Sequence, residues 1–277
     1  MIKKQIFFVF LLVTTSFYLH TAEKTDINPH IEKLQNSSKK NNSDTQNEVS
    51  QDEISDDDFL EDEEETPQVE DPWEGFNRAM FAFNDAFLTY FMKPLAIGYS
   101  YIIPRFLRQG IANVFQNAYM PIRFVNSLLQ AKWSKALRAT GRFTINTTVG
   151  VGGLWDPAKI WFGMEPVDED TGQTLGVWGF GYGIPIHWAF LGPSSTRDTF
   201  GFVGDLLLKP QTYIVPLLMP DKPLQASAIT IGIFFFESMN RLSLNPYEYD
   251  ELKKDAPDPY IFFRDIYLQN REERVKR

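Results

Sequence analysis

The sequence of 277 residues contains no cysteine. This absence excludes a disulfide framework, a thiol nucleophile and a thiolate metal site. Histidine is almost as scarce, and His187 is the only histidine beyond residue 70. A metal site built from several histidines in that part of the chain is therefore excluded, and we expect neither a metal nor another cofactor.

Basic residues are outnumbered by acidic residues, and the imbalance lies in the first quarter of the sequence. Residues 1–70 contain 6 Lys and Arg against 16 Asp and Glu, and the rest of the chain contains 21 against 20. The net charge of −9 therefore comes from the first quarter of the sequence, and the remainder is nearly neutral. Nucleic-acid binding needs a concentrated basic face that replaces phosphate counterions, so we expect no nucleic-acid partner.

Long hydrophobic runs are missing as well. Lys3 and Lys4 precede an apolar run from Ile6 to Val13, which continues in weaker form to Leu19. A span of the hydrocarbon core needs roughly 20 apolar residues, and this stretch is shorter. We interpret residues 1–22 as a signal peptide for export, with Ala22 suited to the last position before cleavage.

Residues 23–70 have the composition of a disordered acidic linker. They are rich in Asn, Ser, Gln, Asp and Glu, and Asp52–Glu70 contains 11 acids and no base. A segment with so little apolar content cannot offset the loss of chain entropy, and its like charges repel. We interpret it as a solvated spacer; an acidic docking segment for a basic partner is the alternative.

The folded part begins with "DPWEGFNRAMFAFNDAFLTYF" at residues 71–91. Asp71 is a suitable N-cap, Pro72 suits the first helical position, and Glu74 completes a capping-box pattern. A strongly apolar helix face recurs at spacings of three and four residues, namely Trp73, Phe76, Met80, Phe83, Phe87 and Tyr90. Such a helix is either buried in a large core or half-immersed in lipid.

Polar residues on this helix occur only in its first three turns. They are Asn77, Arg78, Asn84 and Asp85, and we expect them to face polar surroundings. The apolar segments downstream have helical spacing, and none is long enough to cross a bilayer. We expect a helix break at Pro121, a short helix capped by Asp198, and a last helix that starts at Asp258–Pro259. Aromatic residues make up 15% of the chain, with Trp and Tyr near segment ends. Together these patterns favour a protein that lies in one leaflet of a membrane.

Four motifs carry a resemblance to a known family. "DPWEGFNRAMFAFN", "RFTINTTVGVGGLWDPA", "LGVWGFGYGIPIHWAFLGPSSTRD" and "DPYIFFRDIYLQN" occur in this order. In these motifs the chain resembles the MlaA (VacJ) family of outer-membrane phospholipid-trafficking proteins. The resemblance covers a helical domain at residues 71–270, which leaves residues 271–277 as a charged C-terminal tail.

The resemblance implies a fold and a function that composition alone does not give. It implies an all-α fold, with a ring-like arrangement of amphipathic helices in the periplasmic-side leaflet of the bacterial outer membrane and a central amphipathic channel. Mislocalised phospholipids would leave the outer leaflet through this channel and pass to a periplasmic carrier of the MlaC type, which would maintain lipid asymmetry. A porin trimer is the implied membrane partner, and the protein would not be an enzyme.

One feature departs from the family. Most members are lipoproteins that are acylated on a cysteine after the signal peptide, and this sequence has no lipobox cysteine. We therefore expect membrane attachment through embedded helices, a porin partner or an uncleaved signal. A single acyl chain gives only marginal binding, so its loss need not prevent attachment.

Two groups of residues are candidates for the transport site. Glycine permits backbone angles that other residues resist, so Gly150, Gly152 and Gly153 are candidates for a channel hinge, and in the family context for a mobile gate. Arginine matches phosphate geometry, so Arg78, Arg142 and Arg197 are candidates for contact with lipid head groups. For Arg197 the alternative is an ion pair with Asp198 at a helix start.

Two other functions stay open. A structural envelope adaptor would bind porins without transporting lipid. A phospholipid-cleaving enzyme could use His187 with Ser194 or Ser195, yet the sequence has no G-x-S-x-G elbow, and we expect no catalytic residues. Glu169 and Asp170 lie in "MEPVDEDTGQ", which we interpret as a surface turn rather than an acid–base pair.

Overall fold

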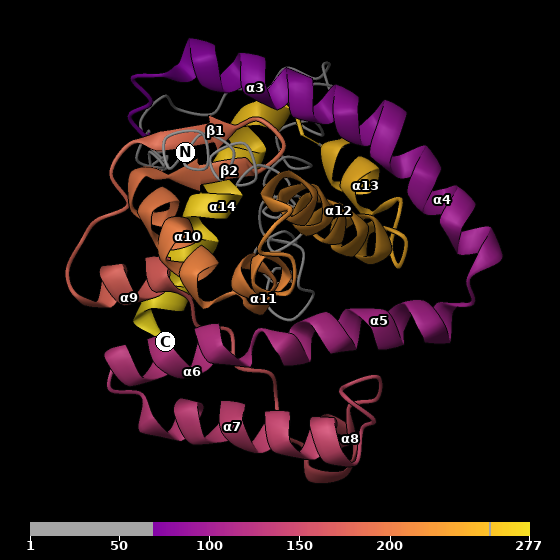
Figure 1. The fold of residues 1–277 in the computed structure, drawn as a ribbon. Coiled ribbons are helices and arrows are strands. Elements are labelled where there is room, and N and C mark those ends of the chain that lie inside the picture. The colour runs from indigo at the N-terminus through magenta and orange to yellow at the C-terminus, as the bar shows by residue number, and fades with distance from the viewer. Residues whose placement is uncertain (1–68, 255) are drawn as a thin grey trace, which may run out of the picture. The chain divides into compact units, whose positions relative to one another are not determined.

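The computed structural model describes residues 69–254 and 256–277. The expected signal peptide and residues 23–68 of the expected linker lie outside these ranges. In chain order and with the labels of Figure 1, the elements are α3 (Glu74–Phe87), η1 (Leu88–Met92), α4 (Lys93–Ile102), α5 (Arg105–Ala118), α6 (Met120–Leu129), α7 (Trp133–Thr148), α8 (Pro157–Phe162), α9 (Thr171–Val177), β1 (Pro185–Trp188), β2 (Gly192–Ser195), α10 (Thr196–Leu208), α11 (Pro210–Leu218), α12 (Pro223–Leu242), α13 (Glu248–Lys254) and α14 (Pro259–Lys276). No helix in the described ranges is both long and apolar enough to cross a membrane.

The predicted first helix forms, but it begins later than the capping pattern suggested. Its N-cap position is Trp73, and the carboxylate of Asp71 accepts a hydrogen bond from the backbone N–H of Trp73 at 3.2 Å. Pro72 therefore lies in a turn before the helix, and α3 starts at Glu74. Helices α3 and α4 continue through the π-helical turn η1 as one long run along the edge of Figure 1.

Helices α5, α6 and α7 follow on the opposite edge of Figure 1. The helix break that we expected at Pro121 lies at Tyr119, because Pro121 is in the first turn of α6, where the missing proline N–H does no harm. Helix α7 returns beside α6. It ends at Thr148, and the predicted glycine cluster forms the turn that follows.

The all-α prediction missed a short β-hairpin. Strands β1 and β2 pair in antiparallel register, with His187 opposite Pro193 and Ile186 opposite Ser194. The aromatic run "WGFGYG" precedes β1 in extended or turn conformation and forms no strand itself. The fold is therefore mainly helical with one two-stranded hairpin among the described residues.

The C-terminal half begins with a helix capped by Ser195, whose side chain accepts from the backbone N–H of Asp198 at 3.1 Å. We expected Asp198 to be the cap, but it lies in the first turn of α10. The predicted start of the last helix is confirmed, since Asp258 caps α14 and Pro259 follows it. Helix α14 continues to Lys276, so the expected tail boundary at residue 270 falls inside it.

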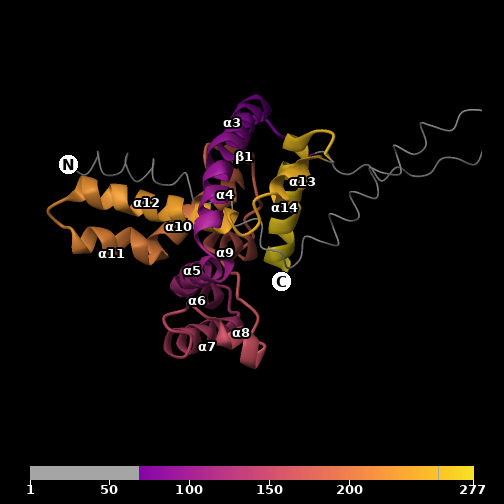
Figure 2. The ribbon, with the colours of Figure 1, turned by 90° about the vertical axis from the view of Figure 1, so that its right-hand side faces the viewer.

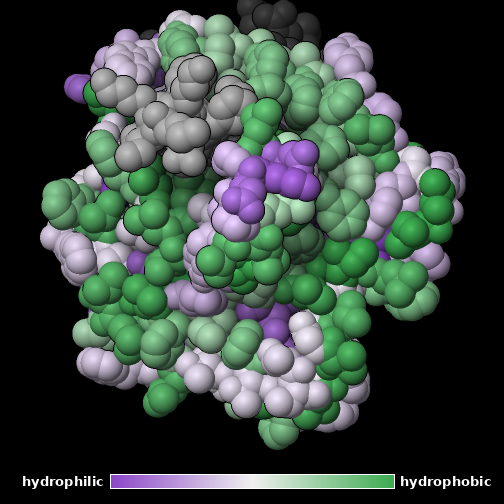
Figure 3. Space-filling view, in the orientation of Figure 1, coloured by the Kyte–Doolittle hydropathy of each residue, from purple (hydrophilic) through white to green (hydrophobic). Residues whose placement is uncertain are grey.

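The apolar core is divided and small. One cluster contains Leu88, Met92, Ala96 and Leu242, and a second contains Leu191, Phe202, Leu206 and Phe234. More large apolar side chains are exposed than buried in the described residues. Figure 3 shows hydrophobic side chains over much of the visible face rather than in one confined patch.

Candidate functional site

Helix α3 buries two asparagines and exposes several of its aromatic residues. Asn77 and Asn84 are 0% and 2% exposed, whereas Phe76, Phe83 and Tyr90 of the same apolar face are 45%, 42% and 82% exposed. The two other residues of the predicted immersed face, Met80 and Phe87, are half-buried. Phe81 of α3 and Leu88 and Met92 of η1 are buried as well, so the inner face mixes amides with apolar side chains. The outer face is rich in aromatic residues, where a water-soluble helix normally has polar ones.

The buried amides of α3 bind the backbone around β1. Asn77 Nδ2 donates to the carbonyl of Pro185 at 3.0 Å, and Asn77 Oδ1 accepts from the N–H of His187 at 2.8 Å. Two helical turns further on, Asn84 Nδ2 donates to the carbonyl of Trp188 at 2.8 Å and Oδ1 accepts from the N–H of Phe190 at 2.6 Å. These amides satisfy backbone groups of β1 and its turn that face α3, which leaves the aromatic face of the helix outside.

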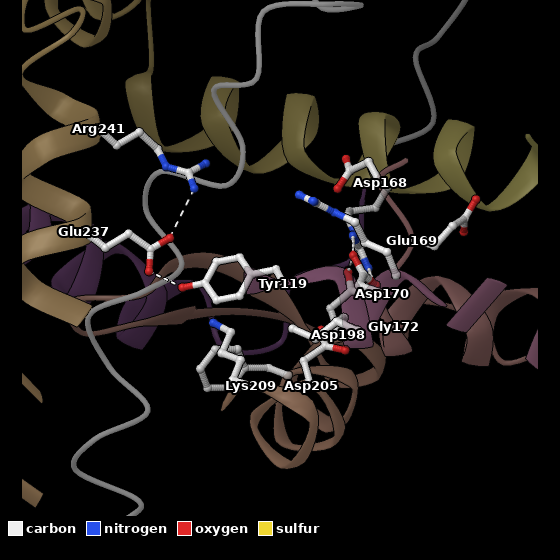
Figure 4. A pocket seen from close by; sticks show the side chains of 14 residues that line it. Tyr119, Asp168, Glu169, Asp170, Gly172, Asp198, Asp205, Lys209, Glu237 and Arg241 are labelled. Carbon is white, nitrogen blue, oxygen red and sulfur yellow. Dashed lines mark hydrogen bonds and ion pairs between the residues drawn. The ribbon is translucent and has the colours of Figure 1, made fainter. Parts of the chain in front are cut away.

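A charged cavity of about 60 Å³ lies among helices α6, α9, α10, α12 and α14. It has room for a few water molecules, since one water needs roughly 10–15 Å³ by this measure. Its lining consists of Tyr119, Ile122, Arg123, Asp168, Glu169, Asp170, Gly172, Asp198, Phe202, Asp205, Lys209, Glu237, Arg241 and Arg271. Figure 4 shows the labelled residues in two groups on either side of the cavity.

One group is centred on the buried guanidinium of Arg271. It donates to both oxygens of Asp170 at 2.6 and 2.8 Å and to both oxygens of Asp198 at 3.0 and 2.9 Å. Burial alone would raise the pKa of each carboxyl, but the charge and hydrogen bonds of Arg271 outweigh burial and hold both pKa values below their usual range. Tyr267 donates to Asp198 at 2.7 Å and completes the group.

The second group joins α12 to the start of α6 and the end of α10. Tyr119 donates from its hydroxyl to Glu237, and Glu237 also pairs with Arg241 at 3.2 Å. The ammonium of Lys209 is buried over the rings of Tyr119, Phe202 and Phe234, at 5.2, 5.5 and 5.1 Å from their centroids. Such cation–π contacts stabilise an ammonium group that has lost its contact with bulk water.

Asp205 lies between the two groups. Its Oδ1 accepts from the backbone N–H of Thr171 at 3.0 Å and from its hydroxyl at 2.6 Å. Burial and the nearby charge of Asp170 raise the pKa of Asp205 to about 7, although the two bonds from Thr171 oppose this rise. The cavity therefore contains a carboxyl that changes charge near neutral pH.

Each of the three arginine candidates has a carboxylate partner within the chain. Arg78 pairs with Asp258 at 2.7 Å and also with Glu74 of its own helix. Arg142 pairs with Asp156 at 2.8 Å. The arrangement of Arg78 and Arg142 is therefore that of structural ion pairs.

Arg197 has the ion pair that we gave as its alternative role. It contacts Asp198 at 3.3 Å and Glu272 at 3.0 Å, and its side chain is buried. It does not line the cavity, whereas Arg271 does. The structure therefore does not bring the three arginine candidates together at one site.

The three candidate glycines form the turn after α7. Gly152 and Gly153 have positive φ values of 72° and 95°, and Val151 between Gly150 and Gly152 also has a positive φ of 55°. A Cβ added at Gly153 would lie 2.7 Å from the side chain of Asn117, whereas a Cβ at Gly152 would meet nothing within 4 Å. The turn exposes Val149, Val151, Leu154 and Trp155.

The residues of the hydrolase alternative do not form a triad. His187 is buried, and its Nε2 has no hydrogen-bond partner among the residues that the structure describes. Burial lowers the pKa of His187 to about 3, so the ring is neutral at physiological pH. The hydroxyl of Ser195 caps α10, and that of Ser194 lies 3.3 Å from Thr199 Oγ1. The described residues also contain no group of three or more potential metal ligands.

The sequence interpretation missed most of the cavity. Glu169 and Asp170 are buried rather than part of a surface turn, with Glu169 paired to Lys132 at 3.3 Å. Lys209 and Glu237 were not considered, although they flank the two uncharged stretches 210–220 and 223–236. Charges placed immediately beside such stretches are the signal that would have found them.

Buried amides, a charged interior cavity and exposed aromatics define a mainly helical protein whose polarity suits a lipid environment. Its sequence identifies it further. The chain belongs to the MlaA lipoprotein family, since the sequence model of that family matches residues 69–274.

Several relatives and a solved structure agree with this assignment. Proteins named "Intermembrane phospholipid transport system lipoprotein MlaA" from Shigella flexneri and Escherichia coli K12 are 32% and 31% identical to this chain, over 73% of it and 77% of each relative. A protein from Rickettsia bellii is 32% identical over 76% of this chain and 78% of the relative. A structure described as "Structural basis for maintenance of bacterial outer membrane lipid asymmetry" matches with a TM-score of 0.62 and 30% identity, covering 75% of this chain and all of that one.

Proposed function

We propose that this protein transports phospholipids between membranes and maintains the lipid asymmetry of a bacterial outer membrane. The observation that carries the proposal is the exposed aromatic face of α3 and η1, opposite the buried asparagines of α3, together with a charged interior cavity elsewhere in the fold. Family membership and the names of the relatives support it. The protein would be a transporter and not an enzyme.

The physical task is to move a polar head group past hydrocarbon. A charged or strongly polar group in hydrocarbon is disfavoured by several kcal/mol, whereas acyl chains are stable there. A ring-like arrangement of helices around an amphipathic channel solves both problems, because the head stays hydrated while the tails remain in lipid. The charged cavity inside a chain with many exposed apolar side chains supports such a channel.

We further propose that the body lies in the periplasmic-side leaflet of the outer membrane. Its exposed aromatic faces would contact acyl chains, and five of its six tryptophans are exposed, as suits an interfacial belt. A periplasmic carrier of the MlaC type would receive the lipid, and a porin trimer would hold the protein in place. With no cysteine to acylate, the apolar surface and the porin would provide the attachment.

The turn at Gly150, Gly152 and Gly153 is our candidate for the channel gate. Its glycines allow the left-handed backbone, and its exposed Val151 and Trp155 would contact lipid. Proline at Gly152 would not test gating cleanly, because the N–H of Gly152 donates to Thr147 at 3.0 Å and its φ is positive. Gly152→Ala preserves that bond and is the better probe of transport.

The function is tested by deleting the gene and labelling the phospholipids exposed at the cell surface. We expect exposed phospholipid to accumulate, and the intact chain to restore the normal level. An adaptor that binds porins without moving lipid would leave the labelling unchanged and alter porin recovery. A phospholipase would release fatty acid from purified protein and lose this activity with His187→Ala.

A further inference from the structure

Two helical pairs lie on opposite sides of the layer that contains α3 to α8. Figure 2 shows α11 and α12 as a hairpin that projects to one side of this layer, with α13 and α14 on the other side. The hairpin therefore points out of the face drawn in Figures 1 and 3, which is largely hydrophobic.

The two sides differ sharply in polarity. Residues 210–220 and 223–236 contain no charged residue, and α11 has no buried residue at all. The exposed apolar side chains of the hairpin are Tyr213, Ile214, Leu217, Leu218, Leu224, Ile229 and Phe236. In contrast, α13 contains three acids and two lysines within 7 residues, and α14 ends in a run of charged residues.

Charged residues occur only at the two ends of the hairpin. At the tip, Asp221 and Lys222 are exposed between the two helices. At the base, Lys209 precedes α11 and Glu237 follows the uncharged stretch of α12, and both line the charged cavity. The hairpin thus has a charged tip, two uncharged stretches at 210–220 and 223–236, which we call its legs, and a base at the charged cavity.

The length of the shorter leg, α11, matches half a bilayer, and α12 is longer. Helix α11 has 9 residues, so at 1.5 Å per residue it is about 14 Å long. A hydrocarbon core is roughly 30 Å thick, so one leaflet contributes about 15 Å. Exposed charges are disfavoured inside hydrocarbon, so a hairpin of this length fits with its tip at a polar interface.

We propose that the α11–α12 hairpin inserts through the outer leaflet, with its Asp221–Lys222 tip at the cell surface and acyl chains around its legs. This rests on the proposed function, which puts the body in the periplasmic-side leaflet. Helices α13 and α14 then face the periplasm, as their charges require. The legs reach the leaflet from which phospholipids must be removed, and their base opens on the cavity lined by Lys209 and Glu237.

The absence of cysteine makes the topology directly testable. The full chain is made with a single cysteine, either Asp221→Cys at the tip or Lys276→Cys at the exposed end of α14. Cells are treated with a maleimide too large to pass through porins, before and after the outer membrane is permeabilised. We expect Asp221→Cys to react in intact cells and Lys276→Cys only after permeabilisation.

Other outcomes overturn the proposal. Reaction of Asp221→Cys only after permeabilisation would mean that the hairpin points into the periplasm. No reaction under either condition would mean that a porin or a second copy of this chain covers the tip, or that the tip stays in hydrocarbon.

A second measurement identifies what surrounds the legs. Purified full-length Leu217→Cys, labelled with a fluorophore and reconstituted in vesicles, should be quenched at least twofold by lipids with brominated acyl chains. Absence of quenching would exclude acyl chains as the neighbours of α11. Rescue of surface-phospholipid labelling in the deletion strain by Asp221→Cys is scored separately, so failed transport and wrong topology give different results.

Discussion

The side chain of Asn77 binds the backbone of His187, whose N–H donates to Asn77 Oδ1 at 2.8 Å across 110 residues of sequence. The same side chain donates to the carbonyl of Pro185. One fully buried amide therefore satisfies two backbone groups of β1, and it determines which face of α3 is turned inward.

Replacement of Asn77 by leucine should destabilise the fold although it makes a buried position more apolar. The N–H of His187 and the carbonyl of Pro185 would both lose their partner, at about 1–3 kcal/mol for each buried group. We expect the free energy of unfolding to fall by about 2–4 kcal/mol, measured by denaturation in detergent. Phe76→Leu, on the exposed face of the same helix, is the control and should change it by less than about 1 kcal/mol. Equal stability of both variants would contradict the role of Asn77.

Two aspartates on the aromatic face of α3 should release the protein from membranes. Phe83 and Phe87 lie 6.3 Å apart between ring centroids, and Phe83 is exposed. Each aspartate in hydrocarbon is disfavoured by about 2.5–3.5 kcal/mol, so Phe83→Asp with Phe87→Asp should weaken membrane binding by roughly a thousandfold or more. Membrane fractionation measures this effect, with Phe83→Leu and Phe87→Leu together as the apolar control. Full retention of a protease-resistant double aspartate variant would show that this face is not immersed.

The helical elements were predictable because they are local. The spacing of apolar residues located α3, and the Asp258–Pro259 pair located the start of α14. Periodicity cannot say which face of a helix is inside, since it separates two faces without naming the surroundings of either. We therefore assigned Asn77 and Asn84 to a polar environment, whereas they are buried against β1.

The charged cavity was not predictable for a different reason. Asp170 and Asp198 meet Arg271 across 101 and 73 residues of sequence, and no local pattern encodes such a meeting. Asp170 lies in the polar stretch "MEPVDEDTGQ", which is typical of a surface turn. Only a positive partner brought in by α14 makes its burial possible.

Replacement of Arg271 by methionine should be among the most damaging single changes in α14. It would leave two buried carboxylates without their cation, which typically lowers stability by about 3–5 kcal/mol. The pKa values of Asp170 and Asp198 are lowered in the folded protein, so their stabilising effect is present above about pH 4 and is lost as the pH falls further. The loss should therefore be large at pH 7 in a denaturation experiment and smaller at about pH 2, where the stabilising effect of the two carboxylates has begun to disappear.

Arg274 supplies a matched control one turn away. It pairs with Asp168, whose side chain is 29% exposed, so water can replace the lost partner. Arg274→Met should lower stability by about 1 kcal/mol or less. A similar loss from both variants would mean that Arg271 acts through packing rather than through its buried charge.

Alanine substitutions should distinguish two neighbouring glycines of the turn after α7. Both have left-handed φ values, so alanine adds about 1–2 kcal/mol of backbone strain at either position. At Gly153 the new methyl group would also overlap Asn117, whose amide donates to Thr147 at 2.9 Å. Gly153→Ala should therefore have the lower unfolding midpoint of the two in detergent, and the opposite order would mean that the turn rearranges easily.

Asp205 should make stability depend on pH near neutrality. Its pKa is about 7 in the folded protein and close to 3.8 in an exposed carboxyl, so the folded state binds its proton more tightly. The stabilisation that comes from this bound proton is fully present below about pH 4. It is lost as the pH rises to 7, at about 1.4 kcal/mol per pH unit. Asp205→Asn cannot titrate, so its stability relative to the original chain should increase between pH 5 and about pH 7 and then level off. Thermal unfolding of both proteins in detergent at stepped pH measures this difference. A flat difference for Asp205→Asn would show that water in the cavity keeps this carboxylate solvated.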